Sequence, residues 1–232
     1  MECGDKSPHS KEVRESTVMK DVKRLLEQNR VWAESIKANN PEFFPTLAKQ
    51  QTPKFLWVGC SDSRVPSSQL VGLVPGEMFV HRNVANVVVH TDFNCLSVMQ
   101  YAVDVLKVEH IIVCGHHNCG GVKAAMDNPQ LGLIDNWLRH VQDVIHQHQA
   151  ALAKIDDEDK RLNRLCELNV IEQVVNVGRT TIVQSAWERG QELAVHGWIY
   201  SLEDGLLRDL GVSIDNARGL PAAYQIAICN AV

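Results

Sequence analysis

The segment KFLWVGCSDSR (residues 54–64) decides the fold, together with HIIVCGHHNCGG (residues 110–121). Each segment begins with an apolar run of strand length and ends on side chains that can bind a metal. Helical periodicity over residues 94–107 makes a right-handed crossover between two parallel strands the expected connection. Since the carboxyl ends of parallel strands lie at one edge of a sheet, the side chains that follow the two runs should meet there.

The rest of the chain alternates between helical and strand patterns. Strands are expected over residues 54–60, 110–115 and 192–200, with another after Gly205, and helices over residues 17–39, 94–107, 133–153 and 168–190. This alternation predicts an α/β fold with a mostly parallel central sheet flanked by helices. We expect residues 1–15 to be a disordered tail and residues 16–232 to form a single domain, with a solvated turn at 156–159.

The residues that follow the two strands have the side chains of a zinc site. His116 and Cys119 are separated by two residues, a spacing that lets one turn of the chain present both to the same ion. Cys60 supplies a third ligand, and mixed thiolate and imidazole ligands suit a borderline-soft cation. The fourth tetrahedral position is left to Asp62 or to water, which is typical of catalytic rather than structural zinc.

Composition excludes several classes of protein. The 232 residues are 45% hydrophobic and 22% charged, which is enough for one substantial core. The net charge of -5 and the lack of a basic run argue against nucleic acid as a partner. Seven scattered cysteines favour reduced thiols, and no segment has the pattern of a secretory signal or a membrane span, so a cytoplasmic protein with no membrane partner is expected.

Five sequence blocks carry a family resemblance. They are CSDSR (60–64), PGEMFVHRNVAN (75–86), HTDFNCLSVMQYAVDVLKVEHIIVCGH (90–116), GHHNCGG (115–121) and SAWERGQELAVHGWIY (185–200). In these blocks, and from about Leu26 to about Leu210, the chain resembles the β-class carbonic anhydrases. The resemblance implies a zinc enzyme that reversibly hydrates carbon dioxide to bicarbonate and a proton. Within the family, the chain is similar to the bacterial-type subclass in which the aspartate of CSDSR can itself bind the metal.

The resemblance assigns roles to individual residues. Cys60, His116 and Cys119 would bind zinc, and Asp62 could become the fourth ligand. A bidentate clamp by Arg64 would hold the Asp62 carboxylate off the metal, and opening the clamp would let Asp62 block the site. Asp62 and Arg64 are thus the implied catalytic pair. The implied substrate pocket consists of Gln51, Phe79, Val84, Tyr101 and the backbone amide of Gly121.

A regulatory pocket for bicarbonate is implied at Trp57, Arg82 and Tyr200. Bicarbonate bound there would favour the state with Asp62 on the metal, an effect that requires different affinities for two conformations. The alternative is an Arg82 that pairs with a surface carboxylate. His117, next to a ligand, either relays protons or lies inertly at the pocket rim.

The resemblance also implies an oligomer. In the family, the leading helix reaches a neighbouring subunit, so the apolar stripe of residues 17–39 is expected to pack on a partner subunit in a homodimer or homotetramer. Packing of this stripe on the chain's own core is the alternative. Some residues of the substrate pocket would come from the second subunit.

Two other functions fit the zinc ligands. One is another zinc hydrolase on the same scaffold, such as a carbon disulfide hydrolase, and the other is a non-catalytic bicarbonate-binding or structural zinc protein. Asp62 and Arg64 argue against the second, since a purely structural site needs neither. For an anhydrase, two thiolates would cancel the charge of zinc, so the pKa of bound water should fall less than at a three-histidine site, where it is near 7. Activity should therefore favour alkaline pH.

Overall fold

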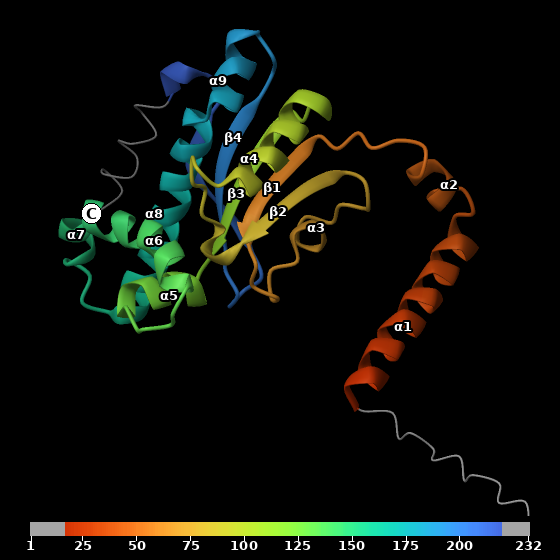
Figure 1. The fold of residues 1–232 in the computed structure, drawn as a ribbon, viewed down its shortest axis with the longest axis horizontal. Helices are drawn as coiled ribbons and strands as arrows, with labels where there is room; N and C mark the ends of the chain where they lie inside the picture. Colours follow the sequence, from red (N-terminus) through yellow and green to blue (C-terminus); the bar gives the residue numbers. More distant parts are fainter. Residues whose placement is uncertain (1–16, 220–232) are drawn as a thin grey trace, which may run out of the picture. The chain divides into compact units, whose positions relative to one another are not determined.

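The computed structural model describes residues 17–219 (Figure 1). The tail predicted over residues 1–15 lies outside the described residues, as do residues 220–232. The chain divides into two compact units, residues 1–50 and residues 51–232, and the predicted single domain stays a prediction. Within the described part of the chain, no helix has the length and apolar character needed to cross a membrane.

The first unit contains the predicted leading helix, α1 (Thr17–Asn39), and the short helix α2 (Phe43–Leu47). The apolar side chains of α1 are largely exposed, and Leu26 reaches 68% exposure. The Trp32 ring packs edge-on against the Phe44 ring, with the ring centres 5.8 Å apart. The helix prediction is confirmed, whereas a partner for the apolar face of α1 stays a prediction.

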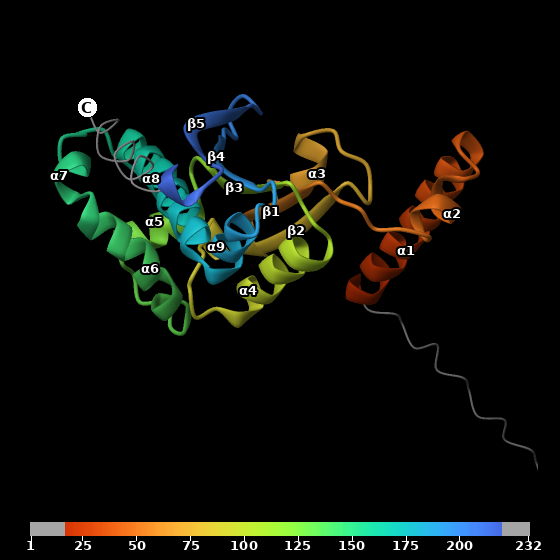
Figure 2. The ribbon, with the colours of Figure 1, turned by 90° about the horizontal axis from the view of Figure 1, so that it is seen from above.

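The second unit is built on a five-stranded sheet with the order β2-β1-β3-β4-β5 (Figures 1 and 2). Its strands are β1 (Phe55–Cys60), β2 (Met78–Asn83), β3 (His110–His116), β4 (Ala194–Tyr200) and β5 (Leu207–Ile214). The first four are parallel, whereas β5 runs antiparallel to β4 at one edge. The predicted mostly parallel sheet is confirmed. The sequence pattern does not predict β2, because this edge strand has a single buried residue and lacks an apolar run.

Helices cover both faces of the sheet. They are α3 (Ser67–Leu70), α4 (Phe93–Gln100), its π-helical continuation η2 (Tyr101–Val105), α5 (Gly120–Asp127), α6 (Ile134–Gln147), α7 (Gln149–Leu152), α8 (Glu158–Arg179) and α9 (Thr181–Glu188), with the 3₁₀ turns η1 (Val84–Asn86) and η3 (Ala217–Gly219). Helices α4, α8 and α9 lie on one side of the sheet and α3 on the other (Figure 2). Helix α8 contacts β3 and β4 directly, and α5 and α6 pack against α8.

Helix α8 begins at Glu158, earlier than the start predicted at residue 168. The Asp157 carboxylate accepts a hydrogen bond from the Lys160 backbone N–H at 2.8 Å and so caps the helix. The acidic stretch that was expected to be a solvated turn therefore includes the cap and the first turn of α8. Negative charge is favourable there because it faces the positive end of the helix dipole.

Two predicted helices are each interrupted. Residues 133–153 form α6 and α7, which meet at His148. Residues 168–190 contain the end of α8 and all of α9, separated by the extended residue Thr180, whose Oγ1 accepts the Val183 backbone N–H at 3.3 Å. Apolar periodicity continues through both interruptions, so periodicity alone does not reveal them.

The sheet separates a larger core from a smaller one. Cys60 belongs to the larger core, which α4 and α8 cover, and Trp57 belongs to the smaller core on the other face. Strands β1, β3 and β4 are parallel, and their register places His116 beside Tyr200 at the carboxyl ends. The residues that follow β1 and β3 therefore gather at one edge of the sheet, as expected for an α/β fold.

Candidate metal centre and active site

Three potential metal ligands meet at the carboxyl edge of the sheet. Cys60 is the last residue of β1, His116 is the last residue of β3, and Cys119 directly precedes α5. Their Sγ atoms and an imidazole nitrogen lie within 4.8 Å of one another, and the two sulfurs are 3.8 Å apart. All three side chains are buried. The structure thus brings together the three residues that the sequence analysis named as zinc ligands.

The His116 ring has the orientation of a metal ligand. Its Nδ1 lies 3.0 Å from the carbonyl oxygen of His117, which can only accept, so Nδ1 carries the proton. Nε2 then has a free lone pair, and it is buried without a hydrogen-bond partner among the described residues. An unpaired buried polar atom requires an explanation. Metal-binding histidines commonly donate their other N–H to a carbonyl, so this nitrogen and the two thiols fit a zinc ion.

The two thiols share a proton that a cation would displace. The hydrogen bond from the Cys119 thiol lowers the pKa of Cys60 to about 4, and the same bond raises the pKa of Cys119 above its ordinary value. Cys119 is also the N-cap residue of α5, where the positive end of the helix dipole favours a thiolate. Since thiolates are the form that binds zinc, the pair is suited to hold a divalent cation.

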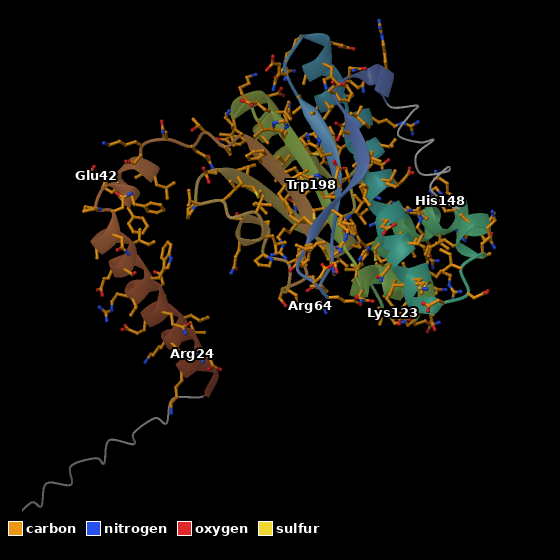
Figure 3. The ribbon with its side chains drawn as sticks, turned by 180° about the vertical axis from the view of Figure 1, so that it is seen from behind. Arg24, Glu42, Arg64, Lys123, His148 and Trp198 are labelled. Carbon is orange, nitrogen blue, oxygen red and sulfur yellow. The ribbon has the colours of Figure 1, made fainter. Side chains whose placement is uncertain are left out.

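Asp62 lies beside the ligands and is held by Arg64. The Arg64 side chain donates two hydrogen bonds to the carboxylate, from Nε to Oδ1 at 2.9 Å and from Nη2 to Oδ2 at 2.6 Å, and its backbone N–H donates a third to Oδ1 at 2.9 Å. These bonds hold the pKa of Asp62 well below its usual range. Asp62 Oδ2 is 3.6 Å from His116 Nε2. Figure 3 shows Arg64 at the end of the sheet that also carries Lys123 of α5.

Two of the predicted substrate-pocket residues lie together near the ligands. Gly121 follows Cys119 in the first turn of α5. A Cβ atom on Gly121 would lie 2.7 Å from Val84 Cγ1 and 3.2 Å from Ala85 Cβ. Non-bonded carbon atoms prefer separations of about 3.5–4.0 Å, so only glycine lets Val84 approach α5 this closely. Val84 and Gly121 therefore form a wall next to the ligand cluster.

The other three predicted pocket residues lie elsewhere in this chain. The rings of Phe79 and Tyr101 pack with their centres 5.9 Å apart, and Tyr101 is 46% exposed. Phe79 pairs with Leu56, four residues before Cys60, which corresponds to about 13 Å along the strand. Gln51 is exposed in the segment before β1. Phe79 is therefore well removed from the ligands of its own chain.

Trp57, Arg82 and Tyr200 share the face of the sheet that carries the smaller core. Trp57 and Tyr200 pack in that core, and the alternation along β2 places Arg82 on the same face. Arg82 donates from Nε to the carbonyl oxygen of Cys60 at 2.8 Å and from Nη2 to that of Asp62 at 2.5 Å. Within the described part of the chain, no surface carboxylate pairs with Arg82. Its guanidinium instead holds the backbone of the segment that carries Cys60 and Asp62.

Helix α8 makes contacts with the site that the sequence analysis missed. Glu167 Oε1 lies 3.2 Å from His117 Nε2, and Glu167 Oε2 accepts a hydrogen bond from Arg164 at 2.9 Å. Asn163 Oδ1 accepts the Asn118 backbone N–H at 3.0 Å. The turn between the candidate ligands His116 and Cys119 is thus held by α8. Neither predicted role of His117, as a proton relay or an inert rim residue, includes its contact with Glu167.

A second group of potential ligands, His81, Asp92 and Cys95, also lies within 4.8 Å among the described residues. Its donor atoms have structural partners. Asp92 Oδ1 accepts the Asn94 backbone N–H at 3.0 Å as the cap of α4, and His81 Nε2 lies 3.2 Å from Asn83 Nδ2. Burial raises the pKa of the Cys95 thiol to about 12, which opposes thiolate formation. The first group, with its unpaired imidazole nitrogen, is the better metal site.

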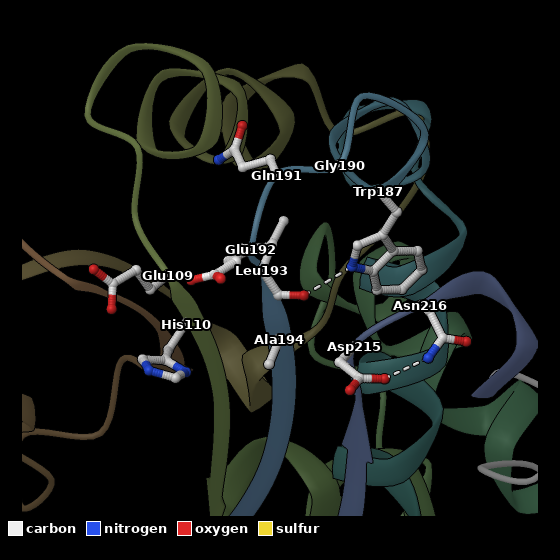
Figure 4. A pocket seen from close by; sticks show the side chains of 10 residues that line it. All are labelled: Glu109, His110, Trp187, Gly190, Gln191, Glu192, Leu193, Ala194, Asp215 and Asn216. Atoms are coloured by element: carbon white, nitrogen blue, oxygen red, sulfur yellow. Dashed lines mark hydrogen bonds between the residues drawn. The ribbon is translucent and has the colours of Figure 1, made fainter.

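A cavity of about 450 Å³ lies at the opposite end of the sheet, where β3 and β4 begin (Figure 4). Its lining includes the carboxylates of Glu109, Glu192 and Asp215. The Trp187 indole N–H closes one side by donating to the Leu193 carbonyl at 2.8 Å. The length of β3, about 20 Å, separates this cavity from the ligand cluster. The cavity is therefore distinct from the candidate metal centre.

The fold and the ligand cluster define a class of protein: an α/β zinc enzyme with a thiolate-rich site at the carboxyl ends of parallel strands. A family model described as carbonic anhydrase matches residues 55–207. The chain is 50% identical to a carbonic anhydrase of Emericella nidulans over 189 residues, which cover 82% of this chain and 83% of that protein. The chain belongs to the β-class carbonic anhydrase family.

Solved structures agree with this assignment. The chain is similar to a structure of the tetrameric β-carbonic anhydrases of Sordaria macrospora, with a TM-score of 0.80, 39% identity and coverage of 84% of this chain and 99% of that chain. It is also similar to the Coccomyxa β-carbonic anhydrase in complex with acetazolamide, with a TM-score of 0.82, 40% identity and coverage of 89% and 96%. The chain is accordingly a zinc enzyme that hydrates carbon dioxide, and these two predictions are confirmed. The bacterial-type subclass stays a prediction.

Proposed function

We propose that Cys60, His116 and Cys119 hold the zinc ion of this carbonic anhydrase and that Asp62 and Arg64 control access to its fourth position. The observation that carries the proposal is the clamped Asp62 carboxylate, whose Oδ2 lies 3.6 Å from the unpaired Nε2 of His116. Zinc in this site supplies Lewis-acid activation of water for attack on carbon dioxide.

Arg64 keeps the Asp62 carboxylate in one orientation by binding both of its oxygens. Because these bonds hold the pKa of Asp62 low, the carboxylate stays ionised and accepts a hydrogen bond from water instead of storing a proton. The Arg64 side chain is 56% exposed, so water can solvate its guanidinium when the clamp opens. Opening the clamp frees Asp62 to turn toward the metal and exclude water.

The wall formed by Val84 and Gly121 is the proposed binding surface for carbon dioxide. An apolar side chain suits an uncharged substrate. The close approach of Val84 to Gly121 places the Val84 side chain against the first turn of α5. The first backbone N–H groups of a helix have no partner inside the helix. The Gly121 N–H is thus available to bicarbonate, which carries the negative charge that a helix N-terminus favours.

A second copy of the chain is proposed to complete the pocket with Gln51, Phe79 and Tyr101. This proposal is supported by the exposure of the Tyr101 ring and by the distance of Phe79 from the ligands of its own chain. The exposed apolar stripe of α1 offers a further surface for a partner subunit. The similar Sordaria macrospora enzymes are described as tetrameric, and we propose a homodimer or homotetramer here.

Bicarbonate is proposed to act as an inhibitor at Trp57, Arg82 and Tyr200, as in the bacterial-type subclass. Arg82 supplies the connection, because its guanidinium binds the carbonyl oxygens of Cys60 and Asp62. An anion that draws Arg82 away weakens its hold on the backbone that carries Asp62. The anion would then have different affinities for two conformations of the protein, one with Arg82 bonded to this segment and one with Arg82 drawn away, as linkage requires.

The cytoplasm is the proposed location. The five cysteines among the described residues are free and buried, which suits a reducing compartment. Fractionation of cells that express the full-length chain tests this proposal. Recovery in an organelle or outside the cell would contradict it.

Stopped-flow measurement of carbon dioxide hydration, combined with metal analysis, tests the proposed function. We expect one zinc ion per chain and faster hydration at pH 8.5 than at pH 7. Carbon disulfide hydrolysis is measured on the same sample as the control. Faster turnover of carbon disulfide would indicate the other zinc hydrolase, and bound zinc with no turnover of either substrate would indicate a non-catalytic zinc protein.

A further inference from the structure

The backbone between Val84 and Val88 adopts an unfavourable conformation beside the proposed substrate wall. Ala85 has φ 64° and ψ 25°, and Asn86 has φ 47°, although neither is glycine. Both residues are buried, and the Asn86 side-chain nitrogen Nδ2 has no hydrogen-bond partner in the described part of the chain. Asparagine tolerates left-handed backbone, but alanine does not, so this conformation at Ala85 persists only where the surroundings impose it; such residues occur often at functional sites.

Three side chains of α8 form hydrogen bonds with the backbone of this segment. Asn169, Gln173 and Asn176 lie on one face of the helix, at spacings of four and three residues, and are called the α8 row. Asn169 Nδ2 donates to the Ala85 carbonyl oxygen at 2.9 Å. Gln173 Oε1 accepts the Val88 backbone N–H at 2.8 Å, and Asn176 Nδ2 donates to the Val88 carbonyl oxygen at 3.2 Å.

The α8 row is also bonded internally. Gln173 Nε2 donates to Asn169 Oδ1 at 3.0 Å, and Asn176 Nδ2 donates to Gln173 Oε1 at 3.1 Å. Asn169 and Gln173 are each 1% exposed. From the other side, the Asn83 side chain bonds both the N–H and the carbonyl oxygen of Val87, at 2.8 and 2.7 Å. A buried network with its members bonded to one another fixes one geometry, because each lost bond would leave a buried polar group unpaired.

The segment held in this way is the one that meets α5 beside the zinc ligands. Val84 Cγ1 and Ala85 Cβ are the side-chain atoms that would collide with a Cβ on Gly121. The Val84 carbonyl oxygen accepts the Trp137 indole N–H at 2.8 Å. A shift of this segment would move the wall, and a displacement of about 1 Å in a positioning element can cost about 100-fold in rate.

We propose that the α8 row positions the carbon dioxide wall: Asn169, Gln173 and Asn176 hold the left-handed backbone at Ala85 so that Val84 stays against Gly121. This inference rests on the proposed function, which assigns Val84 and Gly121 to the substrate pocket. The three residues of the α8 row are positioning residues, and they act through the backbone of residues 85–88.

Asn169→Leu tests the inference, because it removes the bond to Ala85 and replaces the amide with an apolar side chain of similar size. We expect kcat/KM for hydration to fall about 10- to 100-fold with zinc content unchanged. The exchange of the Trp137 indole proton, followed by NMR, should accelerate because its acceptor carbonyl moves. Ile171→Val is the matched control, since Ile171 is buried on α8 but lies about 200° around the helix from Gln173.

Two further variants keep the inference open to refutation if Asn169→Leu does not fold. Asn176→Ala, at the less buried end of the α8 row, should show the same two changes at smaller size. In an Ala85→Gly background, loss of Asn169 should cost less activity, since glycine adopts left-handed backbone without strain. Unchanged kcat/KM per zinc and unchanged indole exchange in a folded variant would overturn the inference. A wild-type chain that lacks zinc or activity would instead refute the proposed function.

Discussion

Strand β3 carries a histidine at each end, and the two residues have opposite surroundings. At the amino end, His110 Nδ1 lies 3.2 Å from His196 Nε2, and the His110 ring stacks on Phe55 with the ring centres 5.5 Å apart. At the carboxyl end, His116 Nε2 is buried without a partner among residues 17–219 and faces two thiols. One histidine is bonded within the protein, and the other keeps a lone pair for a ligand.

The proposed active site of this chain is thus marked by free donor atoms and not by the size of a cavity. A cavity of about 450 Å³ opens at the amino end, where it is lined by carboxylates. The carboxyl end instead combines two thiols, an imidazole nitrogen and a clamped carboxylate. Ligands in open α/β sheets gather at the carboxyl ends of the strands, and here the chemistry of the side chains agrees with that rule.

Replacing each histidine in turn should give the largest contrast. We expect the zinc affinity of His116→Gln to fall because a direct ligand is removed. The fall should exceed the roughly 10- to 100-fold that loss of a supporting hydrogen-bond partner costs. His110→Gln should retain one zinc per chain and most of the activity. Metal analysis after dialysis against a chelator measures both. Full zinc occupancy in His116→Gln would break the comparison between the two ends.

A smaller effect is expected at the Asp62 clamp. Arg64→Ala should keep its zinc and its Tm but lose about 10- to 100-fold in hydration rate, because the freed carboxylate can occupy the fourth position. Lys54→Ala is the matched control, since Lys54 forms an exposed ion pair with Glu109 at the opposite end of the sheet, where β1 and β3 begin. Removing that pair should change stability by about 0–1 kcal/mol and leave activity intact.

A crystal structure of Arg64→Ala at pH 8.5 distinguishes the two roles of this ion pair. Asp62 within about 2.0–2.2 Å of zinc supports the gate. A lowered Tm with activity intact, and Asp62 turned away from the metal, would show that the pair only stabilises the fold.

The pH profile of carbon dioxide hydration should depend on the metal ligands at the carboxyl end of β3 and not on His110 at its amino end. We expect hydration to rise several-fold between pH 7 and pH 8.5, because two thiolates reduce the acidifying effect of zinc on water relative to three imidazoles. The His110→Gln profile should coincide with that of the wild type. A rate that is flat from pH 6.5 to pH 8.5, measured by stopped flow, would contradict the assignment of two thiolate ligands.

The smallest effect on zinc content is expected from a substitution in the first unit. Leu26→Asp on α1 should weaken association and lower activity while zinc content stays full, because the exposed apolar stripe of α1 is proposed to pack on a partner. Sedimentation should give a dimer or tetramer for the wild type. A fully active wild-type monomer of 25.9 kDa would rule out a shared pocket.

The ligand end of β3 is predictable from the sequence because its determinants are local. An apolar run of strand length ends directly on Cys60, and another ends on His116, with Cys119 three residues later. The rule for parallel strands then brings these ends together without further information. Strands β1, β3 and β4 and helix α1 are predictable for the same reason. Along each of them, apolar residues recur at the spacing of a strand or a helix without interruption.

The supports of the site are not predictable in this way. Arg82 binds the carbonyl oxygens of Cys60 and Asp62, and the α8 row binds the backbone near Ala85, over sequence separations of about 20 to 88 residues. Any residue can supply a backbone carbonyl, so such partners leave no pattern in the sequence. Edge strand β2 and the start of α8 are missed because their positions depend on pairing and capping rather than on apolar periodicity.

X-ray absorption at the zinc edge of the purified wild-type chain tests the central claim most directly. Ligation by Cys60, His116 and Cys119 predicts two sulfur atoms at about 2.3 Å and one nitrogen at about 2.0–2.1 Å, with one further light atom completing the shell. A shell of nitrogen and oxygen alone, or one with a single sulfur, would contradict the assignment of the metal centre to the carboxyl ends of β1 and β3.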